Sequence, residues 1–161
     1  MKSIKKMNNH GFNLIEILIA SSILASVLVG LALLMGSIIR SNSQANNRVM
    51  AGDLTQSGSD FFRQERKVLG FGRLKQELSS SSYCLNNTSQ SLLDENELLR
   101  TQFNINNCDY AIEIDGTPTK FKRVAEISLS DDLIEILIIT SWIADNNQVS
   151  EVSSALQLRP R

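Results

Sequence analysis

Glu16 is the residue that most needs a chemical explanation, because it carries the single charge in the 28 residues from 12 to 39. Inserting a carboxylate at mid-membrane costs roughly 2.5–3.5 kcal/mol, so a glutamate in such a segment is a functional candidate. It lies near the start of the apolar run, where the positive end of a helix favours an anion. A partner amine about 4 Å away, at an effective dielectric near 20, would return about 4 kcal/mol. The alternative is a carboxylate that reaches the lipid headgroups without a partner.

Cys84 and Cys108 are the only two cysteines, and both follow the apolar run. In an oxidising compartment an even pair predicts one disulfide. Two free structural thiols, or a redox or metal site, are the alternatives. Neither cysteine belongs to a Cys-x-x-Cys pattern and neither has a histidine nearby, which counts against zinc.

The context of Glu16 is a motif at the start of the chain. Residues 5–16, KKMNNHGFNLIE, resemble the cleavage and methylation site of type IV prepilins. That family has a short basic leader ending in glycine, then phenylalanine, a small or polar residue, two aliphatic residues and glutamate, at the start of a long apolar helix. The residues that match position by position are Gly11, Phe12, Leu14, Ile15 and Glu16.

The resemblance implies that prepilin peptidase removes a leader of residues 1–11 by cutting after Gly11, and methylates the new amine of Phe12. A glycine suits this step because it has no side chain to obstruct a peptidase and resists helix formation; the alternative is a merely flexible residue before a helix. In the family, the glutamate of this motif, which is Glu16 here, is thought to pair with the amine of a neighbouring subunit as the helix enters the filament.

The only histidine is His10, which would leave with the leader. The mature chain would then lack imidazole, and with it Ser-His-Asp, Cys-His and His-metal chemistry. We therefore expect no enzymatic activity, no catalytic or metal-binding residues and no cofactor. The formal net charge of −1 gives no reason to expect direct nucleic-acid binding.

Charge and length together predict a single membrane span. Three of the 16 Lys and Arg residues precede Gly11, which leaves 13 against 17 Asp and Glu in residues 12–161, a net charge of −4. A basic tip before an apolar segment faces the cytoplasm. Residues 12–39 would form about 42 Å of helix, more than the ~30 Å of a bilayer core, whereas a secretory signal has a shorter apolar core. Charge and length place the C-terminal domain outside the cytoplasm, and the prepilin resemblance implies the bacterial inner membrane and then a pilus or periplasmic filament as the location.

The predicted elements give an α+β, pilin-like fold. One helix is expected over 12–69: its half 12–39 is apolar and its half 40–69 is amphipathic. Residues 70–161 are expected to form a connecting loop over 70–108, with a short helix over 92–99 as an option, and then an antiparallel sheet. The four predicted strands are 110–115, 120–130, 133–143 and 149–158, separated by turns at 116–118, 131–132 and 145–147.

Two smaller features complete these expectations. Trp142 lies in the most β-branched strand and is expected in the core. The cluster Arg63, Glu65, Arg66 and Lys67 is expected to be a solvated helix face, with salt bridges in a filament as the alternative.

Beyond residue 40 the resemblance to the pilin family extends to the architecture alone. The helix lacks the proline common in major pilins, and the cysteines do not bracket the C-terminal segment, so the chain is more similar to minor pilins and pseudopilins. The expected function is a structural subunit, a minor pilin, of a type IV pilus. Its implied partners are prepilin peptidase, other pilin subunits, the inner-membrane assembly platform and motor, and membrane lipid along 12–39. The alternatives are a pseudopilin of a type II secretion system and a membrane-anchored periplasmic binding protein.

Overall fold

The computed structural model describes residues 14–79, 81–88, 103–114, 116–144 and 147–160. These residues contain one long helix, a short 3-10 helix and six strands. The chain divides into two compact units, residues 1–43 and 44–161. The first consists of the N-terminal part of the helix, and the second contains the rest of the helix and all the strands.

The helix α1 runs from Leu14 to Glu77 and has one break, at Gly70. Gly70 has φ 75° and ψ 163°, a conformation open to glycine but strained for other residues. The predicted helix over 12–69 is confirmed from Leu14 onward. Residues 71–77, which we assigned to the connecting loop, are helical instead, because Phe71, Leu74 and Leu78 recur at helical spacing and pack into the core.

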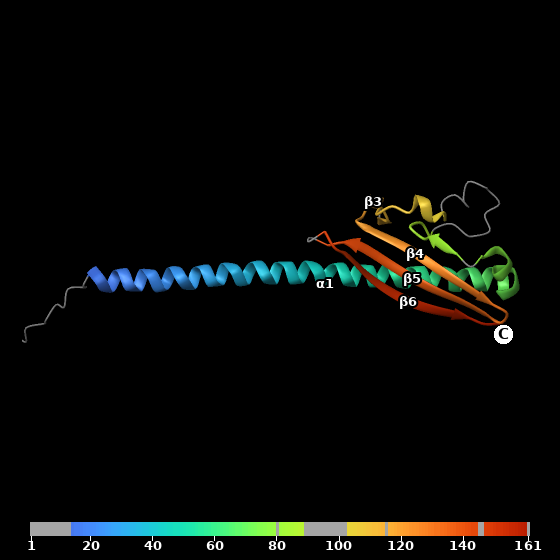
Figure 1. Cartoon of the computed structure of the whole chain (residues 1–161), viewed down its shortest axis with the longest axis horizontal. Helices are drawn as coiled ribbons and strands as arrows, with labels where there is room; N and C mark the ends of the chain where they lie inside the picture. The colour runs from blue at the N-terminus through green and yellow to red at the C-terminus, as the bar shows by residue number, and fades with distance from the viewer. Residues whose placement is uncertain (1–13, 80, 89–102, 115, 145–146, 161) are drawn as a thin grey trace, which may run out of the picture. The chain divides into compact units, whose positions relative to one another are not determined.

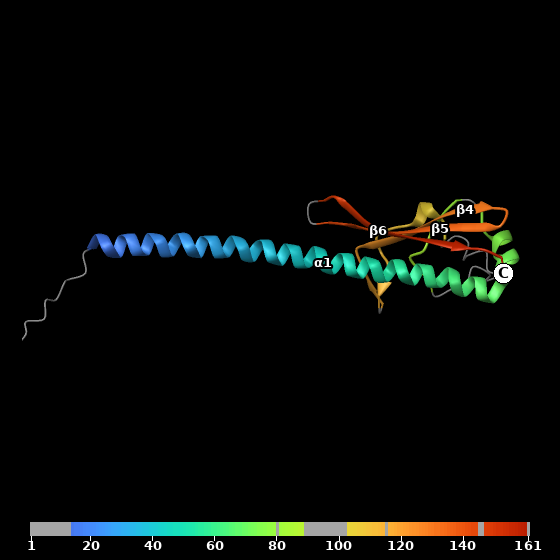
Figure 2. The same ribbon diagram turned by 90° about the horizontal axis from the view of Figure 1, so that it is seen from below.

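The main sheet has four antiparallel strands in the order β1-β4-β5-β6. Their bounds are Ser82–Cys84, Phe121–Ser130, Leu133–Ile143 and Val149–Leu158. The last three form a meander, and in Figures 1 and 2 they lie side by side along the second half of α1. The α+β, pilin-like fold predicted from the sequence is therefore confirmed.

The fourth strand of this sheet is not the predicted one. The predicted strand 110–115 forms only the two-residue β2 (Glu113–Ile114), which pairs with β3 (Thr117–Pro118) in a separate hairpin around Gly116. Pro118 has no N–H to extend that ladder. β1 pairs with the edge of β4 instead, with Tyr83 opposite Ala125. The possible helix over 92–99 lies outside the described residues, as do residues 145 and 146 of the last predicted turn.

Alternation along the strands places the core between the sheet and α1. Even-numbered residues of β5 and odd-numbered residues of β4 face α1 and are mostly buried. Phe62, Ile134 and Ile138 are fully buried at its centre. Trp142 is in the core as predicted, with its ring 5.9 Å from that of Phe121.

Candidate functional site

The candidate site is the apolar N-terminal part of α1 with its single carboxylate. Glu16 lies in the first turn of α1 and is exposed, so it is placed where the positive helix end stabilises an anion. Gly11 and Phe12, the predicted cleavage and methylation residues, lie outside the described residues. The structure therefore places the glutamate but not the amine expected to meet it.

No side chain from Leu14 to Ile39 is buried in the chain itself. The large apolar side chains of this segment are between 49% and 74% exposed. By length and composition the segment could span a membrane. An apolar surface of this extent is far larger than a soluble monomer normally exposes, and it marks a contact with lipid or with other proteins.

The serines of this segment are compatible with an apolar environment because their hydroxyls are satisfied within the helix. Ser21, Ser22, Ser26 and Ser37 each donate to the carbonyl three residues earlier, at distances of 2.7–2.9 Å. Such back-bonding removes the cost of an unpaired hydroxyl in lipid. These serines therefore act as small residues and need no polar partner on another helix.

A stripe of small side chains on this helix lies beside the stripe that carries Glu16. At about 100° per residue, Ser22, Ser26 and Gly30 fall on one face. Ile23 and Val27, together with Glu16, form the adjacent stripe, about 80° around the helix. Small residues let a second helix approach closely, whereas the face that carries the carboxylate is bulky.

In the second unit, Arg123 fixes the sheet to the helix. Its side chain is 2% exposed, and it donates to the Leu85 carbonyl through Nε (2.8 Å) and Nη2 (2.6 Å), and to the Leu54 carbonyl through Nη1 (2.5 Å). Burial lowers the pKa of Arg123 to about 10, so the guanidinium remains charged at neutral pH. One buried cation thus joins β4, α1 and the segment after β1.

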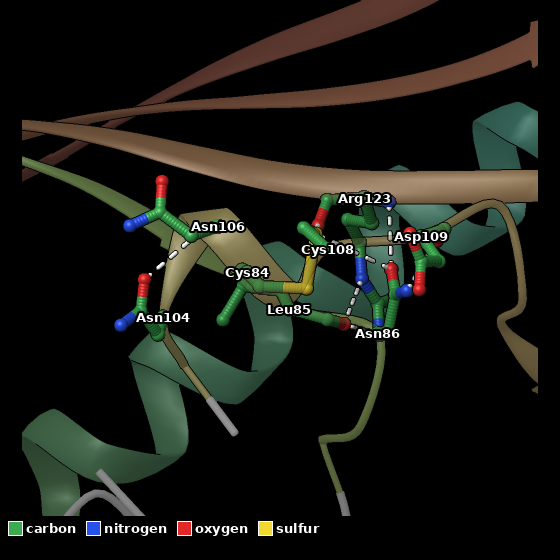
Figure 3. Close-up of a disulfide and its surroundings, with 8 residues drawn as sticks. All are labelled: Cys84, Leu85, Asn86, Asn104, Asn106, Cys108, Asp109 and Arg123. Atoms are coloured by element: carbon green, nitrogen blue, oxygen red, sulfur yellow. Dashed lines mark hydrogen bonds between the residues drawn. A yellow bond between two sulfur atoms is a disulfide. The ribbon is translucent and has the colours of Figure 1, made fainter. Parts of the chain in front are cut away.

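The disulfide lies next to this arginine (Figure 3). Cys84 and Cys108 are bonded to each other, with their Cα atoms 5.3 Å apart, as predicted. The Asn86 side chain makes two hydrogen bonds beside the disulfide. It accepts from the Arg123 backbone N–H (3.0 Å) and donates to the Asp109 carbonyl (2.7 Å). The disulfide and Asn86 together hold the segment around residue 108 against β4.

The charge cluster on α1 differs from the prediction. Arg63 and Lys67 are exposed as expected, but Glu65 is 5% exposed and belongs to the buried face of the helix. The reason is spacing: Glu65 follows Phe61 and Phe62 by one helical turn, on the side that packs against the sheet.

Sequence reasoning missed Arg123. Arg123 occupies a core-facing position of β4, between Phe121 and Ala125. A charged residue among the alternate positions that face the core was the sequence signal that could have identified it. In the described part of the chain, no group of three His, Cys, Asp or Glu side chains could hold a metal ion. Comparisons with protein-family models, curated proteins and solved structures find no match to this chain.

Proposed function

We propose that this chain is a prepilin-like structural subunit, cut after Gly11 and methylated at Phe12, which is held in the bacterial inner membrane by its apolar helix and then enters a pilus-type filament as a minor pilin. The observation that carries the proposal is the exposed apolar helix from Leu14 to Ile39 with Glu16 in its first turn. The prepilin-like motif, residues 5–16, overlaps the start of this helix.

The apolar surface needs two successive environments in this account. Before assembly, lipid covers it, and the internally bonded serines make this inexpensive. After assembly, neighbouring helices replace the lipid. The small face around Ser22, Ser26 and Gly30 permits close packing of such helices.

Glu16 selects the position of the incoming helix. Its carboxylate is exposed on the helix, and cleavage would create an amine at Phe12, four residues earlier. If the two groups of neighbouring subunits pair, each offsets the other's cost of leaving water. A subunit that lacks the carboxylate would leave a neighbour's amine buried and unpaired.

The proposed partners follow from these steps. Prepilin peptidase cuts and methylates the precursor, other pilin subunits cover the apolar helix, and the inner-membrane platform and motor move the subunit out of the bilayer.

The test compares the entry of three proteins into filaments: wild type, Glu16→Val and a matched control, Ile23→Val. Membrane levels and leader removal should be equal for all three, because Glu16→Val makes the span more apolar. Glu16→Val should be depleted in sheared filaments by about tenfold or more, the effect of losing at least 1.4 kcal/mol. Ile23→Val should enter as wild type does.

The other outcomes separate the rival accounts. Equal entry of all three would refute the pairing of Glu16 with an amine. Absence of all three from filaments, in cells that assemble filaments, would favour a plain membrane anchor. Recovery of all three only in a periplasmic filament that depends on a type II secretion system would identify a pseudopilin.

A further inference from the structure

The edge of the sheet at β6 is open. β6 pairs with β5 on one side, and the structure places no strand on its other side within the described ranges. An open edge presents unpaired N–H and C=O groups, and proteins usually protect it with lysine, proline or a bulge. The ten residues of β6, VSEVSSALQL, include neither lysine nor proline and carry one charge, Glu151.

A groove of about 720 Å³ runs beside the C-terminal half of this strand. One wall is formed by Arg63, Arg66, Lys67 and Phe71 of α1, and the other by residues 156–158 of β6. Consecutive strand residues point to opposite faces of a sheet. A groove that touches all three therefore follows the backbone edge of β6, not one face of the sheet.

The helix wall of the groove is cationic. Arg63, Arg66 and Lys67 share one helix face, and no carboxylate lines the groove. Arg63 pairs with Asp60 at 3.1 Å, but both side chains are more than half exposed, so this pair contributes little. The positive wall contrasts with the chain's net charge of −1.

The cations are available to a ligand. Arg66 uses Nη2 to donate to the Arg159 carbonyl, which leaves most of its five donors unused. Lys67 is exposed and makes no hydrogen bond or ion pair within the described part of the chain. Phe71, Leu156 and Leu158 add an apolar floor between these charges and the strand edge.

We propose that this groove binds an extended acidic segment of a partner protein, which adds as a strand to the open edge of β6. Main-chain hydrogen bonds to β6 would supply affinity, and alternate side chains would face α1. Carboxylates at those alternate positions would meet Arg63, Arg66 and Lys67. A nucleic acid would use the cations but neither the strand edge nor the apolar floor.

The test uses the full chain in neutral detergent micelles and three labelled probes. The first is a ten-residue peptide that alternates threonine and glutamate, the second replaces glutamate with lysine, and the third is a short DNA duplex. Binding is followed by fluorescence anisotropy, and the contact is located by amide chemical-shift changes. The groove variant is Arg66→Glu/Lys67→Glu. The matched control is Arg48→Glu/Arg73→Glu, two reversals at exposed positions of α1 outside the groove.

We expect the glutamate peptide to bind, to shift amides of β6, and to lose about tenfold or more in affinity in the groove variant. The control variant should bind it as wild type does, and the lysine peptide should not bind. The proposal is overturned if the glutamate peptide does not bind, or if both variants weaken it equally. Tighter binding of DNA with the same dependence on Arg66 and Lys67 would also overturn it, in favour of a polyanion site. None of these outcomes depends on leader cleavage or filament entry.

Discussion

Gly58 of α1 lies so close to Arg123 of β4 that a methyl group at this position would force its neighbours to shift by a few tenths of an ångström. A Cβ at Gly58 would stand 3.1 Å from Cδ of Arg123 and 3.1 Å from Cγ2 of Ile138. Neither neighbour can move aside easily, because Arg123 is held by hydrogen bonds to the carbonyls of Leu54 and Leu85, and Ile138 is fully buried. This glycine sets the distance between the helix and the sheet.

The first prediction is that Gly58→Ala destabilises the second unit although alanine favours a helix. The gain in propensity is about 1 kcal/mol, whereas overpacking a tight contact costs about 1–3 kcal/mol. The control is Gly52→Ala, at a helical position where a Cβ meets nothing within 4 Å; it should stabilise by up to about 1 kcal/mol. Chemical unfolding followed by circular dichroism measures both. Equal stabilisation by the two substitutions would show that the close contact does not constrain the packing.

The second prediction concerns the buried cation. Arg123→Met should lower the free energy of unfolding by about 2–4 kcal/mol, because the Leu85 and Leu54 carbonyls lose charged donors. Arg123→Lys should recover only part of the loss, since one ammonium cannot reproduce the planar fork. Unfolding midpoints of the three proteins provide the measurement. Full stability of Arg123→Met would mean that these hydrogen bonds contribute nothing net.

The pH dependence of the same residue follows from its pKa. Burial lowers the pKa of Arg123 to about 10, so folded and unfolded chains are both charged at this side chain near pH 7. Above the folded-state pKa, the Arg123 side chain keeps its proton more often in the unfolded chain than in the folded chain. Stability would therefore rise with pH only in that range. The difference in stability between wild type and Arg123→Met should therefore be the same at pH 6 and pH 8. A difference that changes across this range would assign the effect to another titrating group.

The third prediction is that the disulfide carries a large share of the second unit's stability. Cys84 and Cys108 are 24 residues apart, and closing such a loop is worth about 3–4 kcal/mol in the chain-entropy model. Cys84→Ser/Cys108→Ser should lose about that amount. Alkylation in freshly lysed cells should find no free thiol in the wild type. If both cysteines are alkylated there, the predicted export of this unit is wrong.

The sequence was informative where residue composition and neighbouring turn residues delimit an element. The bounds of β5 and β6 were predicted because residues 133–143 are rich in β-branched and aromatic side chains and turn residues at 131–132 and 145–147 precede the two strands. β1 was missed because its three residues carry no recognisable period, and the pairing with β4 decides their structure. From the sequence, Gly58 indicates only a low helix propensity, since the sequence does not reveal the approach of Arg123. The disulfide needed no tertiary information, and the pairing role of Glu16 stays a prediction.

The central claim is that the chain is a prepilin-like precursor cut after Gly11, and the intact mass of the protein extracted from membranes tests it most directly. In cells with an active prepilin peptidase, we predict the mass of residues 12–161 with one added methyl group on the Phe12 amine and with the disulfide intact. Gly11→Val, which places a branched side chain before the cleaved bond, should give the mass of the uncut precursor. A wild-type mass that still includes residues 1–11 would contradict the account.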